Sequence, residues 1–196
     1  MRKIEEIASG IYQIKNFISE ESCSFIINNL EKNLIETPRP YIYGFMQSRY
    51  PEHLSIVEDG SGADRVTLDF VNSLFLSMGY IVSSIYKEDH ILKQTFYSLM
   101  LKGSENGLHS DNYYIDESGE LQVRVDSPQD KSAVLYLNNE YSGGLLEFPE
   151  NNISIKPDPG TLIVFEGDES RPHRVNIVEA GLRYNLITFF EPKKIL

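Results

Sequence analysis

Two histidines, an aspartate and an arginine in the C-terminal half of the chain have the residue types and spacing that metal chemistry needs. His109 and Asp111 form an H-x-D pair, and His173 and Arg183 follow further along the chain. Two imidazoles and one carboxylate on one side of a metal bind Fe(II) and leave the remaining positions open. Alternate residues of a strand point to the same side, so His109 and Asp111 can face one ion. The pattern predicts an iron site in which His173 arrives from a distant strand.

Arg183 opens an alternating segment whose phase directs the guanidinium to the interior. Arg183, Asn185, Ile187 and Phe189 share one face of the predicted strand. An unpartnered buried charge costs on the order of several kcal/mol, whereas the planar guanidinium pairs with a carboxylate through two hydrogen bonds. We therefore expect Arg183 to bind an anionic ligand inside the fold, and a dicarboxylate would satisfy it.

The segments that must position these residues form a series of short predicted strands. Apolar runs alternate with Gly, Pro and Asn turns, and Pro157-Asp-Pro-Gly160 has the residues of a sharp reversal. Short strands in such a series predict a jelly roll. The predicted strands cover residues 95–102, 121–125, 132–138, 145–148, 153–156, 161–166, 175–178 and 182–190.

The N-terminal half predicts supporting elements. A short strand over 11–17 precedes Ser19, which can cap a helix. A second helix is predicted from residue 64 to about 86, covering a sheet. Between them, residues 37–62 are rich in Pro, Gly, Tyr and Ser and are predicted to be a long loop, with too many aromatic residues for disorder. The predicted apolar faces are Phe25, Ile26, Leu30 and Leu34 in the first helix, and Val66, Phe70, Leu74, Met78 and Ile81 in the second.

The expected fold class is α+β, mainly β, with a double-stranded β-helix (jelly-roll) core and N-terminal supporting helices. The 196 residues suit one domain, with 1–93 as helical and loop elaboration and 94–196 as the core. A net charge of −11 without any Lys/Arg-rich run argues against a nucleic-acid partner. The chain contains no run of 18 apolar residues, so we expect no membrane span. The single cysteine, Cys23, is expected to be a buried thiol, and the protein to be cytoplasmic.

An ordered series of motifs in the C-terminal half resembles a known family. The series consists of Ala133-Val-Leu-Tyr-Leu-Asn138, Tyr141-Ser-Gly-Gly-Leu-Leu-Glu-Phe148, Pro159-Gly-Thr-Leu-Ile-Val-Phe165, His173-Arg-Val175 and Gly181-Leu-Arg-Tyr184. With the H-x-D pair, it resembles the 2-oxoglutarate/Fe(II)-dependent dioxygenase superfamily, and within it the prolyl 4-hydroxylase-like branch, over residues 97–191.

The resemblance implies a set of roles. His109, Asp111 and His173 would be the catalytic Fe(II) ligands, and Arg183 and Tyr136 would hold the far carboxylate of the cosubstrate 2-oxoglutarate. O2 would be the oxidant, with ascorbate as a reductant, and the products would be succinate, CO2 and a hydroxylated substrate. Because Asp111 is present, the resemblance favours hydroxylation over halogenation.

Two positions depart from the family pattern. Many relatives have a hydroxylated or aromatic residue on the strand before the H-x-D loop, where this chain has Leu99 or Leu101, and Tyr97 is better explained by core packing. Relatives also often have Thr four residues after the arginine, where this chain has Ile187. Some hydrogen bonds to the cosubstrate are therefore expected from elsewhere.

The branch suggests proline as substrate, either free or within a peptide, but substrate choice depends on loops. Residues 37–62 and 113–131 are the expected walls and lid. His53 and His90 have no second ligand at a useful spacing and are expected at the surface. The substrate-binding candidates are Arg39, Tyr41, Arg49, Arg124 and Asn185.

Three alternatives stay open at this point. The first is oxidation of another amino acid or small metabolite. The second is dealkylation of nucleic acid, which the acidic charge balance disfavours. The third belongs to another class of protein, a non-catalytic jelly-roll binding module whose histidines are structural.

Overall fold

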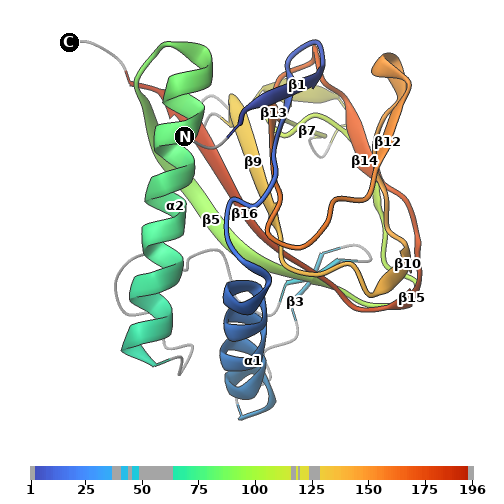
Figure 1. Cartoon of the computed structure of the whole chain (residues 1–196). Coiled ribbons are helices and arrows are strands. Elements are labelled where there is room, and N and C mark those ends of the chain that lie inside the picture. Colours follow the sequence, from blue (N-terminus) through green and yellow to red (C-terminus); the bar gives the residue numbers. More distant parts are fainter. Residues whose placement is uncertain are drawn as a thin grey trace.

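The computed structural model describes residues 3–36, 41–43, 46–48, 64–115, 118, 120–123 and 129–193. Two helices cover one face of a large antiparallel sheet, and a smaller sheet lies against its other face (Figure 1). This arrangement confirms the predicted mainly β, jelly-roll fold with supporting helices.

The large sheet runs through both halves of the chain. Its strands, in spatial order, are β1 (Glu5–Ala8), β2 (Ile11–Ile14), β13 (Leu162–Glu166), β9 (Lys131–Tyr136), β16 (Arg183–Pro192), β5 (His90–Met100), β4 (Met46–Ser48) and β3 (Tyr41–Tyr43). The longest pairing, β16 with β5, places Arg183 opposite Met100 and Asn185 opposite Ser98. The predicted N-terminal elaboration and the predicted core therefore share one sheet.

The smaller sheet carries both histidines of the predicted iron site. Its order is β12 (Ile153–Ile155), β11 (Leu146–Phe148), β14 (His173–Val175) and β6 (Asn106–His109). Two short pairs complete the described strands, β10 (Tyr141–Gly143) with β15 (Val178–Gly181) and β7 (Tyr113–Ile115) with β8 (Leu121–Val123). A 3-10 turn, η1 (Pro149–Asn151), joins β11 to β12.

Helix boundaries follow from side-chain caps. The α1 helix (Glu20–Glu36) begins after Ser19, whose hydroxyl accepts a hydrogen bond from the Ser22 amide at 3.2 Å. The α2 helix (Arg65–Tyr86) begins after Asp64, which accepts from the Thr67 amide at 2.9 Å. Both predicted helices are thus confirmed.

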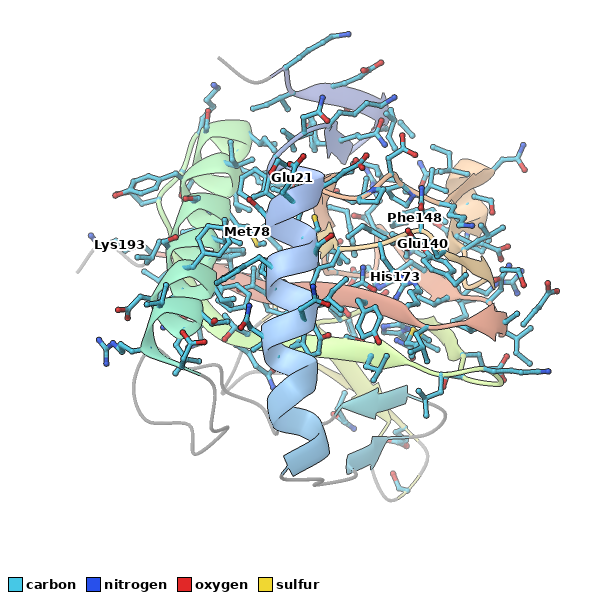
Figure 2. The ribbon with its side chains drawn as sticks, turned by 60° about the horizontal axis from the view of Figure 1, so that its bottom comes forward. Glu21, Met78, Glu140, Phe148, His173 and Lys193 are labelled. Carbon is cyan, nitrogen blue, oxygen red and sulfur yellow. The ribbon has the colours of Figure 1, made fainter. Side chains whose placement is uncertain are left out.

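The helices bury one side of the large sheet. Ile26 and Leu30 of α1 and Leu74 and Met78 of α2 lie in this core, as does Cys23. Figure 2 shows Met78 on the helical side of the fold and His173 among the strands. Two predicted core positions are wrong, since Phe25 is 38% and Val66 70% exposed. The Leu34 side chain lies outside the described residues.

Strand alternation directs the remaining side chains between the two sheets. On β9, Ala133 and Leu135 pack against the helices, whereas Val134 and Tyr136 belong to the core between the sheets. The same alternation on β16 separates Leu186, on the helical side, from Ile187. The inner core is therefore the place where a ligand cavity can form.

The sequence-based element boundaries need three corrections. The predicted loop over 37–62 contains β3 and β4, which extend the large sheet, while its residues 37–40, 44–45 and 49–62 lie outside the described residues. The predicted strand over 175–178 is two strands, β14 and β15, because the chain crosses between sheets at Asn176 and Ile177. Strand β6, which ends at His109, is absent from the predicted series.

The α2 helix also meets the length and hydropathy that a membrane-crossing helix needs. In the folded chain, its apolar residues Val71, Phe75 and Val82 are buried against the sheet. A core helix can have the same composition, so this observation is weak evidence for a membrane span.

Candidate metal and anion site

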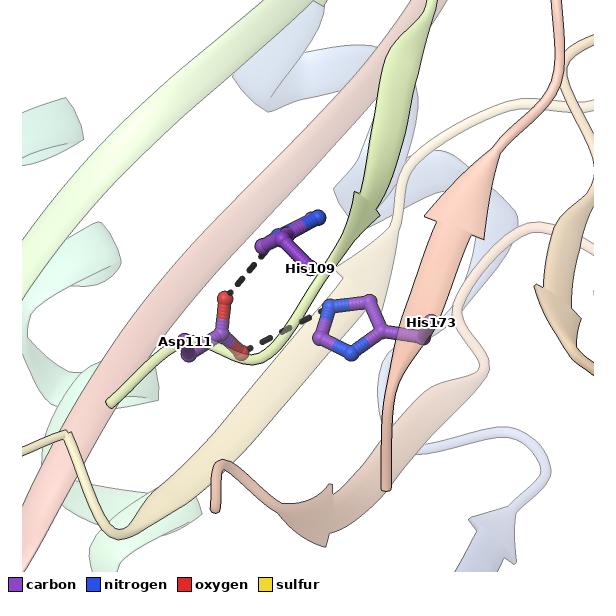
Figure 3. A group of neighbouring side chains, drawn as sticks. All are labelled: His109, Asp111 and His173. Carbon is purple, nitrogen blue, oxygen red and sulfur yellow. Dashed lines mark ion pairs between the residues drawn. The ribbon is translucent and has the colours of Figure 1, made fainter. Parts of the chain in front are cut away.

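The smaller sheet brings the three candidate metal ligands together. In the pairing of β14 with β6, His173 lies directly opposite His109, and their ring centroids are 4.4 Å apart. Asp111 follows the end of β6, with Oδ1 3.3 Å from His109 Nε2 and Oδ2 3.6 Å from His173 Nε2 (Figure 3). One ligand atom from each side chain lies within 4.8 Å of the others. The group has the donor set and compactness that a bound metal ion requires.

Both imidazoles are oriented by backbone carbonyls. His109 Nδ1 lies 2.7 Å from the Gly107 carbonyl oxygen, and His173 Nδ1 lies 3.0 Å from that of Arg171. A hydrogen bond donated from Nδ1 puts the lone pair of the neutral ring on Nε2, which is the usual arrangement of a metal-ligating histidine. Asn106, on β6, places its amide nitrogen 3.3 Å from His109 Nε2.

Burial and charge set the ionisation of this group in the direction that metal binding needs. Burial lowers the pKa of His173, although Asp111 opposes the effect. Burial would raise the pKa of Asp111, but the two histidines and the Ser132 hydroxyl together lower that pKa to about 2. A neutral imidazole and an ionised carboxylate are the forms that bind a metal.

The triad opens into a cavity between the two sheets. Apolar side chains make up most of its wall, and Asn106, the triad, Tyr136 and Arg183 are its polar groups. Phe165 packs its ring 4.6 Å from that of His173. The apolar members of the wall are Phe96, Met100, Val134, Leu146, Phe165, Val175, Ile187 and Phe189.

Arg183 is a buried cation on the wall of the same cavity. Its side chain is 2% exposed, Nη2 donates to the Tyr136 hydroxyl at 3.0 Å, and Nη1 contacts Met100 Sδ at 3.2 Å. No carboxylate among the described residues forms an ion pair with it. A buried guanidinium without a counter-charge is a site for an anion.

Further buried polar atoms lie beside Arg183. Arg183 Nε and both side-chain polar atoms of Asn185 form no hydrogen bond with any of the residues that the structure describes. Burial raises the pKa of Tyr136, and it raises the pKa of Tyr141, beside Arg183, to about 12. Both phenols therefore keep their protons at neutral pH and can serve as donors. These groups fit an anionic ligand, which would supply the missing acceptors.

Most of the predicted substrate-binding residues lie in segments that the structure does not describe. Arg39, Arg49, Arg124 and His53 lie outside the described residues, and so does the side chain of Tyr41 on β3. Asn185 is fully buried on β16, between Arg183 and Ile187. His90 is only partly exposed, with Nδ1 2.8 Å from the Glu88 carbonyl oxygen.

On strand β5, Phe96 and Met100 line the cavity. Leu99, the position at which many relatives have a hydroxylated or aromatic residue, packs on the helical side instead. Tyr97 belongs to the core, as expected, and its ring stacks on that of Tyr184 with centroids 6.0 Å apart. The sequence analysis also missed Ser132, although its even spacing from Tyr136 on one strand indicates an inward position.

Comparisons with known proteins agree with this geometry. Residues 95–191 match the family model of the 2OG-Fe(II) oxygenase superfamily. A Pseudomonas putida prolyl-4-hydroxylase superposes with a TM-score of 0.68 at 20% identity, covering 94% of each chain. The viral collagen prolyl hydroxylase from Paramecium Bursaria Chlorella virus-1, in its 2OG complex, gives a TM-score of 0.64 at 18% identity, covering 94% of this chain and 97% of that one. At such identities, these likenesses show a shared fold.

Curated relatives match over a shorter stretch. Prolyl 3-hydroxylase 2 from Homo sapiens is 33% identical over 91 residues, as is its counterpart from Rattus norvegicus. The match covers 42% of this chain but only 13% of those proteins. Residues 95–191 therefore belong to the 2OG-Fe(II) oxygenase superfamily. Membership implies Fe(II) and 2-oxoglutarate, and the triad and the Arg183 end of the cavity have the donors that these two ligands need.

Proposed function

We propose that this protein is an Fe(II)- and 2-oxoglutarate-dependent hydroxylase of the prolyl 4-hydroxylase-like branch, acting on proline or a related amino acid, free or within a peptide. One observation carries the proposal: two groups line the same cavity. The first is the cluster of His109, Asp111 and His173, and the second is the buried Arg183, which forms no ion pair with a carboxylate of the described residues. A structural role for the histidines would not require an anion site beside them.

The proposed roles follow from the geometry. His109, Asp111 and His173 hold the metal through two Nε2 atoms and one carboxylate oxygen. When bound, Fe(II) and 2-oxoglutarate supply the oxidising chemistry, in which O2 inserts one oxygen atom into a substrate C–H bond and the cosubstrate becomes succinate and CO2. Ascorbate would serve as an external reductant that keeps the metal in its Fe(II) state.

Arg183 and Tyr136 orient the cosubstrate. Ser132, which contacts Asp111, and Tyr136 lie on the same face of β9, four residues apart. At about 3.3 Å per residue, their α-carbons are roughly 13 Å apart. Arg183 and Tyr136 line the same cavity as the triad. A five-carbon dicarboxylate can then reach the triad with one end while Arg183 pairs with the other.

The apolar wall excludes water from the reacting end. Phe165 and Phe148 pack against the His173 ring, with centroids 4.6 and 5.7 Å away. Phe96 and Phe189, whose centroids are 5.6 Å apart, add an aromatic pair to the wall. A low-dielectric site strengthens the pairing of Arg183 with an anion. It also suits a substrate that presents a saturated carbon rather than a charge.

The prolyl substrate class is supported by the relatives, whereas the intact Asp111 supports hydroxylation rather than halogenation. Collagen and prolyl hydroxylases are among the solved structures and curated proteins that resemble this chain. Arg39, Tyr41, Arg49 and Arg124 remain the proposed substrate-binding candidates in the segments 37–62 and 113–131. An arginine in these segments would be needed to hold the carboxylate of a free amino acid.

A substrate screen tests this proposal. Wild type and His173→Ala are incubated with Fe(II), 2-oxoglutarate, ascorbate and air, together with free proline, other amino acids, proline-containing peptides or single-stranded nucleic acid that carries an N-alkylated base. The expected result is a mass gain of one oxygen on a prolyl compound with wild type only. If only another amino acid or a metabolite is oxidised, the prolyl assignment is wrong. Loss of an alkyl group from the nucleic acid would instead favour the dealkylating alternative.

A further inference from the structure

The carboxylate of Asp111, which follows a strand of the smaller sheet, accepts a hydrogen bond from a hydroxyl of the large sheet. Ser132 Oγ donates to Asp111 Oδ2 at 2.5 Å, which is a short hydrogen bond. Ser132 is completely buried and Asp111 is 9% exposed. Hydrogen bonds of this length to an ionised carboxylate are among the strong ones in proteins.

We propose that Ser132 is a positioning residue for the metal-binding carboxylate, a role that rests on the proposed function. By occupying Oδ2, the hydroxyl fixes the plane of the carboxylate and presents Oδ1 to the metal position beside His109 Nε2. Asp111 then acts as a ligand through one oxygen, which keeps the remaining metal positions open for the cosubstrate and oxygen.

The local chain shows why Asp111 needs such support. His109 is fixed by β6, but Asp111 lies beyond the end of that strand, in a turn. The turn is anchored at its next residue, since the Asn112 amide donates to the Gly167 carbonyl at 2.8 Å and Asn112 Oδ1 accepts from the Gln129 amide at 2.9 Å. These contacts place the backbone of the turn. The Ser132 hydroxyl, which comes from the other sheet, contacts the carboxylate itself.

Packing leaves the Ser132 hydroxyl little freedom to turn away. Ser132 lies on the central strand β9, paired with Phe165 on one side and Phe189 on the other. A methyl group added at Gly167 would lie 3.2 Å from Ser132 Oγ. The hydroxyl is therefore pre-positioned by the rigid sheet, whereas Asp111 is on the less regular segment. A rigid supporting shell of this kind is what holds metal ligands in productive geometry.

Metal affinity, rather than turnover, is the measurement that tests this role. Co(II) is titrated into metal-free protein without cosubstrate or O2, following its visible absorption, for wild type, Ser132→Ala, Ser132→Cys and Ser132→Thr. Removing an orienting hydrogen bond of this type lowers metal affinity by roughly 10- to 100-fold. We expect that loss for the Ala variant and the similarly sized but weakly donating Cys variant, with substantial recovery in the Thr variant, which keeps a hydroxyl.

Ser104→Ala is the matched control. Ser104 is also buried, but its hydroxyl accepts from the Leu101 amide at 3.1 Å instead of contacting a metal ligand. This variant should lose stability without losing Co(II) affinity. If Ser132→Ala fails to fold, the Cys and Thr variants decide the outcome by the same comparison.

The outcomes separate this proposal from the proposed function. If wild type binds Co(II), His173→Ala does not, and the Ala and Cys variants of Ser132 bind as tightly as wild type, the positioning role is wrong while the metal site stands. If wild type binds no Co(II), or binds it equally well after His173→Ala, both the proposed function and the positioning role are wrong.

Discussion

Arg183 donates a hydrogen bond from Nη2 to the Tyr136 hydroxyl at 3.0 Å, and its Cζ atom lies 5.0 Å from the centre of the Tyr136 ring. The two residues come from neighbouring strands, β16 and β9, of the large sheet. They form a cationic clamp on the cavity wall, apart from the candidate metal ligands, which come from the smaller sheet and the turn after β6. The candidate anion site therefore belongs to one sheet and most of the candidate metal site to the other.

Removing the charge of this clamp should weaken cosubstrate binding without affecting the metal. Arg183→Met removes the partner of a buried anion, which costs about 2–5 kcal/mol in binding, or roughly 30- to several thousand-fold in affinity. Tyr136→Phe removes one hydrogen bond to a charged group and should cost about 1.5–3 kcal/mol. Calorimetric titration of 2-oxoglutarate into the anaerobic Co(II) protein measures both losses. Unchanged affinity in Arg183→Met would show that the anion binds elsewhere.

Replacing the unpartnered amide beside the clamp should stabilise the ligand-free protein. Asn185 is fully buried, and neither of its side-chain polar atoms forms a hydrogen bond with the described part of the chain; an unsatisfied buried polar group costs about 1–3 kcal/mol. Asn185→Leu removes that cost, so the melting temperature of the ligand-free protein should rise by a few degrees, at about 2–4 °C per kcal/mol. The same variant should bind 2-oxoglutarate more weakly, because the amide is available to replace the threonine that relatives use.

The two measurements on Asn185→Leu distinguish a ligand-binding amide from a structural one. A structural asparagine would lower the melting temperature when replaced and leave cosubstrate affinity unchanged. Asn139→Leu serves as a control, since its amide lies 3.4 Å from Asp158 near the surface, and it should change neither property greatly.

The buried histidine of the metal site should make the metal-free protein less stable as pH falls. The folded protein keeps His173 neutral because burial lowers its pKa, whereas the unfolded chain takes up a proton near pH 6.5. Below that pH, proton uptake favours the unfolded chain. Asp111, with a pKa of about 2, stays ionised through this range.

Urea denaturation of wild type and His173→Gln, with a chelator present, checks this pH dependence. The free energy of unfolding of wild type minus that of the variant should decrease as pH is lowered from about 7.5 to about 5.5. A difference that stays constant, or grows at low pH, would show that folding does not hold His173 in its neutral form.

Local patterns predicted much of this arrangement. Alternation on a strand was enough to place Arg183 inside, and helical spacing located α2. The H-x-D pair and a distant histidine pointed to residues that the pairing of β6 and β14 brings into contact. Such features depend on residues that are close together in the sequence, or on one regular spacing of apolar side chains.

Other features depend on contacts that no local pattern contains. Short strands such as β3 and β4 have too few residues for a reliable alternation, and their place at the edge of the sheet depends on pairing with β5. Leu99 and Met100 are both apolar, so their composition alone did not show which one faces the cavity. Ser132 gains its role only when the turn after β6 brings Asp111 to it.

Oxidation of the cosubstrate without added substrate tests the central claim most directly. Succinate is measured after wild type, His173→Ala and Arg183→Met are incubated with Fe(II), 2-oxoglutarate and air. We predict slow succinate formation by wild type and none by His173→Ala at any cosubstrate concentration. Arg183→Met should form succinate only at much higher 2-oxoglutarate concentrations, since its metal site is intact. Equal succinate formation by all three proteins, or none by wild type, would contradict a site built from this triad and this arginine.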